Sequence, residues 1–191
     1  MTPLLEVRRV GRVFSGGLFS RRQVRAVSEV SFTLGAGRPE VFAIIGESGS
    51  GKTTLARMIL NAEAPTNGAI LFRGRDLSTI RGGRDRMDFM RSVQPIFQNP
   101  FEAFNPLKRV DRYLFAAARR FAGAATTAEA ERLADAALHQ VGLTLAEVKG
   151  RFPHELSGGQ LQRTAIARAL VPRPALIVAD EPVSMIDASL R

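Results

Sequence analysis

Gly46-Glu-Ser-Gly-Ser-Gly-Lys52-Thr53 is a glycine-rich loop between an apolar run, Val41–Ile45, and a helix-forming segment, Thr53–Leu60. The apolar run is short and β-prone, which predicts a buried strand. We therefore expect a strand, a glycine-rich loop and a helix in succession. This is the structural context in which the pattern GxxxxGK[ST] forms a phosphate-binding loop.

The chemistry of this loop suits a nucleoside triphosphate. Glycines let the backbone curl so that consecutive amides face inward at the positive end of a helix. Lys52 would then reach the β- and γ-phosphates, and the Thr53 hydroxyl would bind Mg²⁺. The alternative is a turn-forming Gly/Ser loop that matches the pattern by chance.

A pair of carboxylates follows a second apolar run near the end of the sequence. Asp180 and Glu181 come directly after Leu176–Ala179, which predicts another buried strand. In open α/β sheets the ligand crevice lies at the carboxyl ends of the strands. Asp180 is suited to holding a metal ion and Glu181 to polarising an attacking water. A solvated acidic turn is the alternative.

The turn Leu156-Ser-Gly-Gly-Gln160 opens another predicted helix, Gly158–Leu170. Ser157 can act as its N-cap, and the free amides and partial positive charge at the helix start suit a second anion. The alternative is an ordinary N-cap after a turn.

Around these motifs the chain alternates between strand and helix patterns, which predicts an α/β fold with a parallel sheet. We expect Leu4–Val13 and Val27–Leu34 to form a hairpin joined by a long, mobile connection at Ser15–Arg25. The other predicted strands are Ala69–Phe72 and Val93–Phe97, and the strand before Asp180 is expected to span Ala175–Ala179. The other predicted helices are Arg109–Phe121 and Ala128–Val141.

Together these residues resemble the ATP-binding cassette (ABC) ATPase family from about Leu4 to Ala188. The resemblance implies a P-loop NTPase core with a parallel sheet, an N-terminal antiparallel β subdomain and a helical signature subdomain. Within one incomplete domain, residues 1–98 would form the β subdomain and P-loop core. Residues 99–160 would form the helical subdomain, and residues 161–191 would return to the core.

The resemblance also assigns roles to individual residues. It implies that Glu181, Gln98 and Lys52 are catalytic and that Thr53, Gln98 and Asp180 bind Mg²⁺. Phe14 would stack on adenine, or else be a half-buried strand residue, and Asp187 lies in Ser184-Met-Ile-Asp187, which resembles the D-loop. The implied ATP-binding residues are Phe14, Gly46, Glu47, Ser48, Gly49, Ser50, Gly51, Lys52, Thr53, Thr54, Ser157, Gly158, Gly159, Gln160 and Asp187.

In this family two cassettes close head to tail on ATP and drive a membrane partner. The segment Gln98–Pro106 resembles the FQxPxxxLNP segment of oligopeptide, dipeptide and nickel importers. The resemblance thus implies an ATPase subunit of an importer for peptides or related small solutes, on the cytoplasmic face of the membrane. Its partners would be a second cassette, permease subunits and, indirectly, an extracytoplasmic solute-binding protein.

Two other functions remain open: a non-transport ABC ATPase acting on nucleic acid or ribosomes, and a non-catalytic nucleotide-binding fragment. The formal net charge of +9 supports the first, but the arginines are spread along the chain without a block of like charges. We therefore expect no direct nucleic-acid partner. The chain ends before the family's switch histidine, which supports the second, and neither His139 nor His154 is placed to replace that residue.

Composition narrows the chemistry further. Because the sequence holds no cysteine, disulfides and thiolate metal sites are excluded, and two histidines are too few to suggest a metal cluster. No apolar stretch approaches the roughly 18 residues that a membrane-spanning helix requires. Glu6, Arg8 and Arg9 also interrupt the apolar core that a secretory signal needs.

Overall fold

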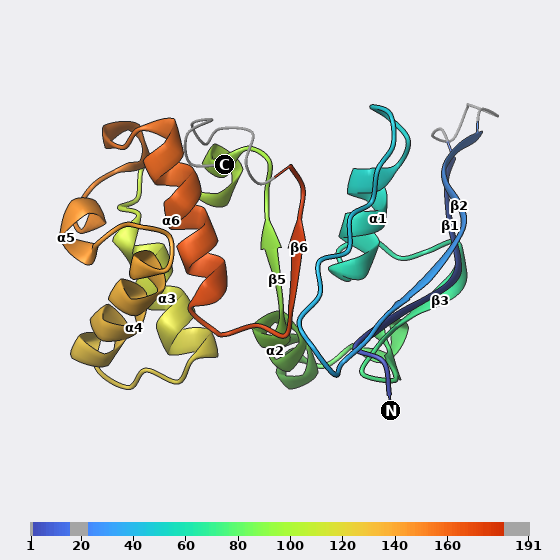
Figure 1. Cartoon of the computed structure of the whole chain (residues 1–191), viewed down its shortest axis with the longest axis horizontal. Coiled ribbons are helices and arrows are strands. Elements are labelled where there is room, and N and C mark those ends of the chain that lie inside the picture. Colours follow the sequence, from blue (N-terminus) through green and yellow to red (C-terminus); the bar gives the residue numbers. More distant parts are fainter. Residues whose placement is uncertain (1, 16–22, 182–191) are drawn as a thin grey trace. The chain divides into compact units, whose positions relative to one another are not determined.

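A computed structural model of the chain describes residues 2–15 and 23–181. The chain divides into two parts, which we call the N-terminal part, Met1–Asp85, and the C-terminal part, Arg86–Arg191 (Figure 1). Among the described helices, none has both the length and the apolar character needed to cross a membrane. The subdomain boundaries expected at residues 98 and 160 stay predictions.

An antiparallel sheet dominates the N-terminal part. Its order is β2-β1-β3-β4, and its strands are β1 (Leu5–Ser15), β2 (Gln23–Leu34), β3 (Asn67–Phe72) and β4 (Arg75–Asp76). β1 and β2 pair from Leu5 opposite Leu34 to Ser15 opposite Gln23. The predicted hairpin and the N-terminal antiparallel β region are therefore confirmed. Residues 16–22 of the expected connection lie outside the described residues.

An irregularity in β1 keeps its apolar face directed inward. Leu5 and Val7 are buried at the strand spacing of two, but the next buried side chain is Val10. The register shifts between Val7 and Val10, where Arg9 has a φ of 43°. Such a bulge adds one residue and returns the apolar series to the buried face.

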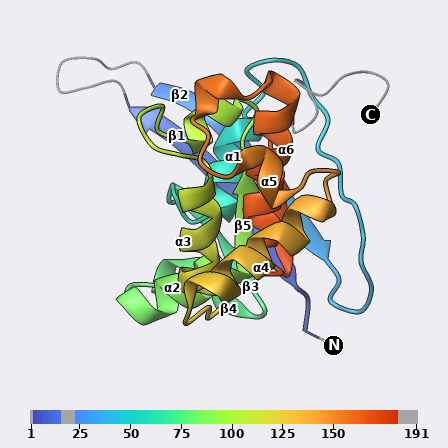
Figure 2. The same ribbon diagram turned by 90° about the vertical axis from the view of Figure 1, so that its left-hand side faces the viewer.

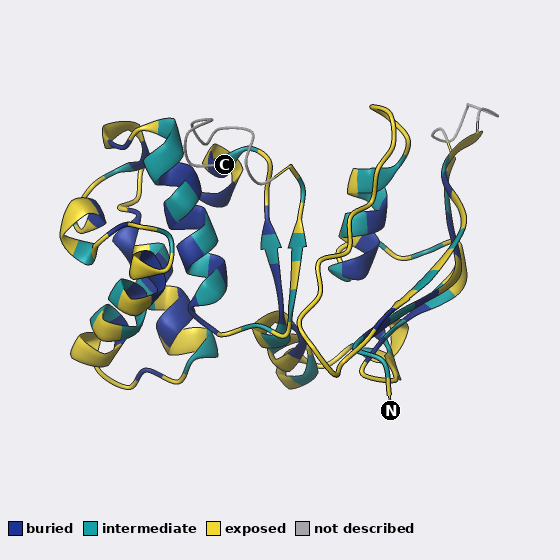
Figure 3. Cartoon of the chain, in the orientation of Figure 1, coloured by how far each residue is buried: buried dark blue, intermediate teal, exposed yellow. Residues whose placement is uncertain are grey.

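The prediction of a strand at Val41–Ile45 is wrong. The structure shows no strand there, and the whole run is exposed, with Val41 99% and Ile45 94% accessible (Figure 3). An extended segment becomes a strand only through hydrogen bonds to a neighbour. No described strand pairs with this run. The helix expected next to the loop is present as α1 (Lys52–Ile59), which buries Leu55 and Met58.

The polar stretch between β3 and residue 93, for which no helix or strand was predicted, contains regular structure. It holds the 3₁₀ turn η1 (Leu77–Thr79) and the helix α2 (Gly83–Ser92), which includes the boundary between the two parts. α2 buries only Phe89, so its apolar periodicity is too weak to identify it from sequence.

Helices form most of the C-terminal part (Figure 2). They are α3 (Asp111–Phe121), α4 (Thr127–His139), α5 (Leu145–Val148) and α6 (Gly158–Leu170), with the 3₁₀ turns η2 (Pro100–Ala103) and η3 (Pro153–Glu155). α3, α4 and α6 pack against one another around a single cluster that includes the fully buried Leu114, Leu138 and Leu161. The predicted helical region is therefore confirmed.

A parallel pair of strands completes the C-terminal part. β5 (Val93–Ile96) runs beside β6 (Leu176–Ala179), with Val93 opposite Leu176 and Ile96 opposite Ala179. Both predicted strands are confirmed. Because parallel strands end at the same edge, the residues that follow Ile96 and Ala179 lie close together.

Candidate functional site

The predicted phosphate loop is a tight turn that leads into α1. The Ser50 amide donates to the Glu47 carbonyl across 3.2 Å, and the Leu55 amide donates to the Gly51 carbonyl across 2.9 Å to begin the helix. Gly51 caps α1 without a side-chain bond, and the first turn holds no acidic residue. The start of α1 therefore offers amide donors to an anion without a carboxylate that competes for them.

Lys52 folds back over the loop. Its ammonium donates to the carbonyls of Gly46 and Glu47, each across 2.7 Å. The ammonium is thereby held inside the curve of the loop, where it can bind phosphate oxygens. Thr53, at the next position, is exposed.

Two glycines of the loop adopt conformations that other residues rarely take. Gly49 has a φ of +80° and Gly51 a φ of +96°. A Cβ at Gly51 would lie 2.0 Å from the Ala26 carbonyl oxygen of β2, whereas a Cβ at Gly49 would meet nothing within 4 Å. The loop is therefore pressed against the sheet at Gly51 and open at Gly49, as a phosphate cradle requires.

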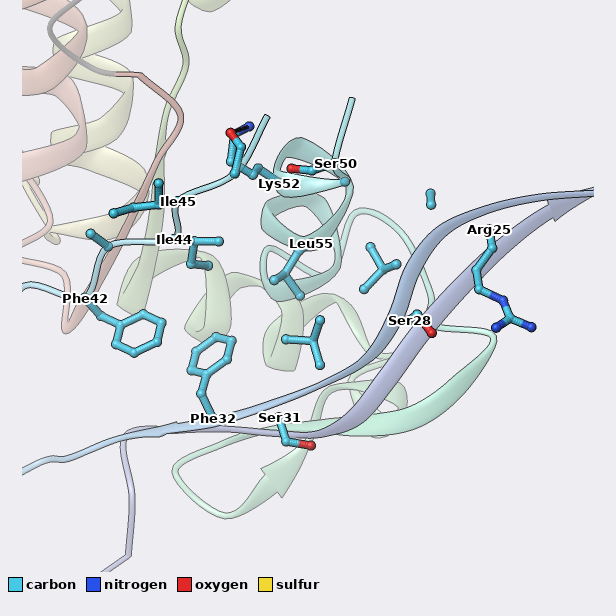
Figure 4. Close-up of a pocket in the computed structure, with 16 residues that line it drawn as sticks. Arg25, Ser28, Ser31, Phe32, Phe42, Ile44, Ile45, Ser50, Lys52 and Leu55 are labelled. Atoms are coloured by element: carbon cyan, nitrogen blue, oxygen red, sulfur yellow. Dashed lines mark hydrogen bonds between the residues drawn. The ribbon is translucent and has the colours of Figure 1, made fainter. Parts of the chain in front are cut away.

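An apolar cavity of about 640 Å³ adjoins this loop within the N-terminal part. Phe32 and Phe42 both line it, and their rings stack on one another with centroids 4.7 Å apart. Figure 4 shows the two rings facing one another beside the helix that carries Leu55. Ser50 and Lys52 lie at the loop side of the same cavity. A ligand on the loop would therefore have an apolar wall next to it.

Phe14, the predicted adenine-stacking residue, lies on β1 and is 38% exposed. The guanidinium of Arg12 covers its ring at 4.7 Å from the centroid, and Arg12 is itself paired with Glu63. One face of the ring is therefore already occupied by a cation, and its role toward adenine stays a prediction.

In the C-terminal part, three predicted site residues meet beyond the ends of β5 and β6. The Gln98 side-chain amide donates to the Glu181 carboxylate across 2.6 Å, and the Asp180 backbone amide donates to the Ile96 carbonyl across 3.0 Å. Glu181 has a φ of 44°, in the left-handed region that side chains other than glycine rarely adopt. The structure thus joins Gln98 and Glu181, which are separated by most of the C-terminal part in sequence.

The Leu156–Gln160 turn caps α6 through a reciprocal pair of bonds. The Gln160 amide donates to Ser157 Oγ across 3.1 Å, and the Ser157 amide donates to the Gln160 side-chain oxygen across 3.0 Å. This capping box confirms that Ser157 is an N-cap. Ser157 is also exposed, so the start of α6 is accessible to an anion.

The two histidines lie away from the strand ends: His139 bonds to the Asp135 carbonyl on α4, and His154 stacks on Phe152. Within residues 2–15 and 23–181 no cluster of acidic and histidine side chains is arranged to hold a metal ion. Asp187 and its D-loop lie outside the described residues.

Sequence reasoning missed two polar side chains of α6. Gln162 is fully buried, and Arg168 is half-buried, and both donate to carbonyls of the segment that follows β5. The sequence gives little sign that these two side chains are buried, because most polar residues of a helix face solvent.

Comparison with known proteins shows the family to which the chain belongs. A family model described as "ABC transporter" matches residues 27–184. The oligopeptide transport ATP-binding protein AppF of Bacillus subtilis is 41% identical over 98% of this chain and 57% of its own length. The nickel import ATP-binding protein NikE of Rhodospirillum rubrum is 43% identical over the whole chain and 68% of its own length. The chain thus spans little more than half of AppF.

Solved structures agree with the fold. The ATP-binding cassette MJ0796, determined as a dimer bound to ADP and Pi, superposes with a TM-score of 0.84 at 26% identity, covering 97% of this chain and 77% of that one. CbiO1 of Clostridium perfringens, part of the transporter complex CbiONQ, superposes with a TM-score of 0.75, covering all of this chain and 70% of that one. The predicted α/β cassette fold is therefore confirmed.

Proposed function

Because this chain belongs to the ABC transporter family, we propose that it binds ATP and hydrolyses it to drive an importer of peptides or related small solutes. The observation that carries this proposal is the phosphate loop at the start of α1, with the Lys52 ammonium held over the Gly46 and Glu47 carbonyls. The names of AppF and NikE, an oligopeptide transport and a nickel import ATP-binding protein, support the importer assignment.

In this proposal the phosphate loop supplies binding. The amides at the start of α1 and the Lys52 ammonium bind the β- and γ-phosphates, with Glu47, Ser48 and Thr54 as further parts of the cradle. Thr53, Gln98 and Asp180 are the oxygen donors that would hold Mg²⁺, and hydroxyl, amide and carboxylate oxygens are the ligands this ion prefers. When bound, Mg²⁺ neutralises phosphate charge.

The strand ends supply the chemistry. Glu181 accepts a proton from the attacking water as general base. The Gln98 amide orients the Glu181 carboxylate through the 2.6 Å bond, so the base is held in one direction before water arrives. Hydrolysis is therefore expected to depend on Glu181 more than ATP binding does.

The accessible start of α6 supplies a contact for a second cassette. We assign to Ser157 and the glycines after it the binding of a phosphate held by a partner cassette, and to Asp187 a part in binding the same nucleotide. The dimeric form of the MJ0796 cassette supports this assignment. Permease subunits at the cytoplasmic face of the membrane and, through them, an extracytoplasmic solute-binding protein complete the proposed importer.

Titration of the chain with a fluorescent ATP analogue and Mg²⁺ tests the binding step. Replacing Lys52 by Ala should weaken binding tenfold or more, because a charge-assisted contact to phosphate contributes about 1.5–3 kcal/mol. Arg57→Ala is the matched control, since Arg57 is an exposed cation on the last turn of the same helix. Equal binding by both variants would contradict the proposal.

A further inference from the structure

We propose that Arg168 is a positioning residue, which fastens the segment Phe97–Asn105 to α6 and so makes Gln98 follow the movement of the signature turn. We call Phe97–Asn105 the anchored segment. The inference rests on the proposed function, because it concerns how the start of α6 and the Gln98–Glu181 pair act together.

Arg168 holds the far end of the anchored segment. It lies in the last turn of α6, where its guanidinium donates to the Ala103 carbonyl across 3.0 Å and lies 5.7 Å from the centroid of the Phe104 ring. Within the described parts of the chain no carboxylate forms an ion pair with Arg168. Burial lowers the pKa of this guanidinium. Burying a cation without a carboxylate partner costs free energy of folding. We therefore assign a structural role to the bond that Arg168 donates to the Ala103 carbonyl.

Gln162 holds the near end of the same segment. This side chain is fully buried on α6, and its amide donates to the Phe97 carbonyl across 3.4 Å. Phe97 directly precedes Gln98. The two α6 side chains therefore bracket the segment, one at the peptide next to Gln98 and the other at Ala103.

Between these two bonds the anchored segment is internally ordered. The Glu102 amide donates to the Asn99 carbonyl across 3.1 Å within η2, and the Phe101 amide donates to Asn99 Oδ1 across 3.0 Å, which caps that turn. At its end the Asn105 amide donates to the Tyr113 hydroxyl across 2.8 Å. A short, bonded turn transmits a displacement better than a flexible loop does.

A continuous path follows from these contacts. A shift of α6, which begins at Ser157, moves the carbonyl-binding side chains Gln162 and Arg168, and with them the peptide of Gln98. Gln98 in turn donates to Glu181. Engagement of Ser157 by a partner cassette is thereby linked to the position of the base, through packed contacts within the C-terminal part.

Hydrogen exchange of the intact chain without nucleotide tests the anchor itself. In Arg168→Gln the amides of Phe101, Glu102, Phe104 and Asn105 should exchange roughly tenfold faster or more, since a bond from a charged donor is lost. Arg163→Gln is the matched control, because Arg163 lies on the same helix but donates to the Gly142 carbonyl across 3.1 Å. Its effect should fall on residues 141–143. Unchanged exchange of the anchored segment in Arg168→Gln would overturn the proposal.

Steady-state kinetics tests the coupling. Arg168→Gln should lower kcat for phosphate release at least fivefold, as loss of about 1 kcal/mol of positioning predicts, while KM for Mg·ATP stays the same. Arg168→Lys should recover part of kcat, because an ammonium can still donate to Ala103. If Arg168 only stabilised the fold, Arg168→Gln would lower the number of nucleotide sites per chain and leave kcat per site unchanged. That result would overturn the inference. A wild-type chain without turnover would instead refute the proposed function, while the exchange experiment would still decide the anchor.

Discussion

Gly51 shows how a single residue joins the phosphate loop to the sheet behind it. Its φ of +96° and its approach to the Ala26 carbonyl leave no room for a side chain, because a Cβ would lie 2.0 Å from that oxygen. Gly49 shares the positive φ but faces open space. A side chain at Gly49 would therefore cause backbone strain alone, whereas a side chain at Gly51 would cause both backbone strain and a steric clash.

We predict that Gly49→Ala lowers the free energy of unfolding by about 1–2 kcal/mol, because only the left-handed conformation is strained. Gly51→Ala should cost about 3 kcal/mol or more, since strain and a clash with backbone add. Urea unfolding without nucleotide, followed by circular dichroism, measures both. Equal losses in the two variants would show that Gly51 is not pressed against β2.

At the level of elements, capping boxes fix where α4 and α6 begin. In α4 the Glu129 carboxylate accepts from the amides of Ala125 and Thr126, while the Glu129 amide donates to Thr126 Oγ1. The amides of Ala125 and then Thr126 hold the pKa of Glu129 below its ordinary value of 4.5. In α6 the same geometry uses an uncharged glutamine, Gln160.

This difference predicts a pH dependence for α4. Because the folded-state pKa of Glu129 lies below 4.5, its ionised form stabilises the fold above pH 4.5, and this stabilisation is lost as the pH falls through the lower folded-state pKa. Glu129→Gln keeps the capping box but removes the charge. Its unfolding midpoint should therefore fall less than that of the wild type between pH 7 and about pH 3.5. An identical fall in both proteins would contradict the assignment.

The elements also show what sequence patterns can and cannot predict. Helices α3, α4 and α6 were predictable because each carries a strong apolar stripe or a cap. The Val41–Ile45 strand was predicted wrongly, because its apolar pattern carries no information about whether a neighbouring strand pairs with it. Gln98 and Glu181 could be proposed as site residues from the sequence, because they lie in recognisable motifs. The anchoring bonds of Gln162 and Arg168 were not, because they depend on which carbonyls face α6.

For the whole molecule, the central expectation is that two cassettes close on ATP through the start of α6. Ser157 serves two roles there: it caps the helix, and it would contact a phosphate held by the partner. Asp caps helices about as well as Ser but carries a negative charge. A substitution can therefore preserve the first role and destroy the second.

We predict that Ser157→Asp keeps the thermal stability of the wild type, or raises it slightly through the helix dipole, and abolishes ATP-dependent dimerisation. Ser157→Ala should instead lower stability by about 1 kcal/mol. Size-exclusion chromatography with Mg·ATP, performed on proteins that also carry Glu181→Gln to slow hydrolysis, measures the dimer. Dimerisation of Ser157→Asp at wild-type nucleotide concentrations would refute the role of α6 in the partner contact.

The most direct test of the proposed ATPase is phosphate release from Mg·ATP, measured beside ATP binding for the wild type and for Lys52→Ala and Glu181→Gln. We predict turnover by the wild type, loss of both binding and turnover in Lys52→Ala, and retained binding with turnover reduced at least a hundredfold in Glu181→Gln, as removal of a general base typically causes. Turnover at the wild-type rate in either variant, or binding that does not depend on Lys52, would contradict the account.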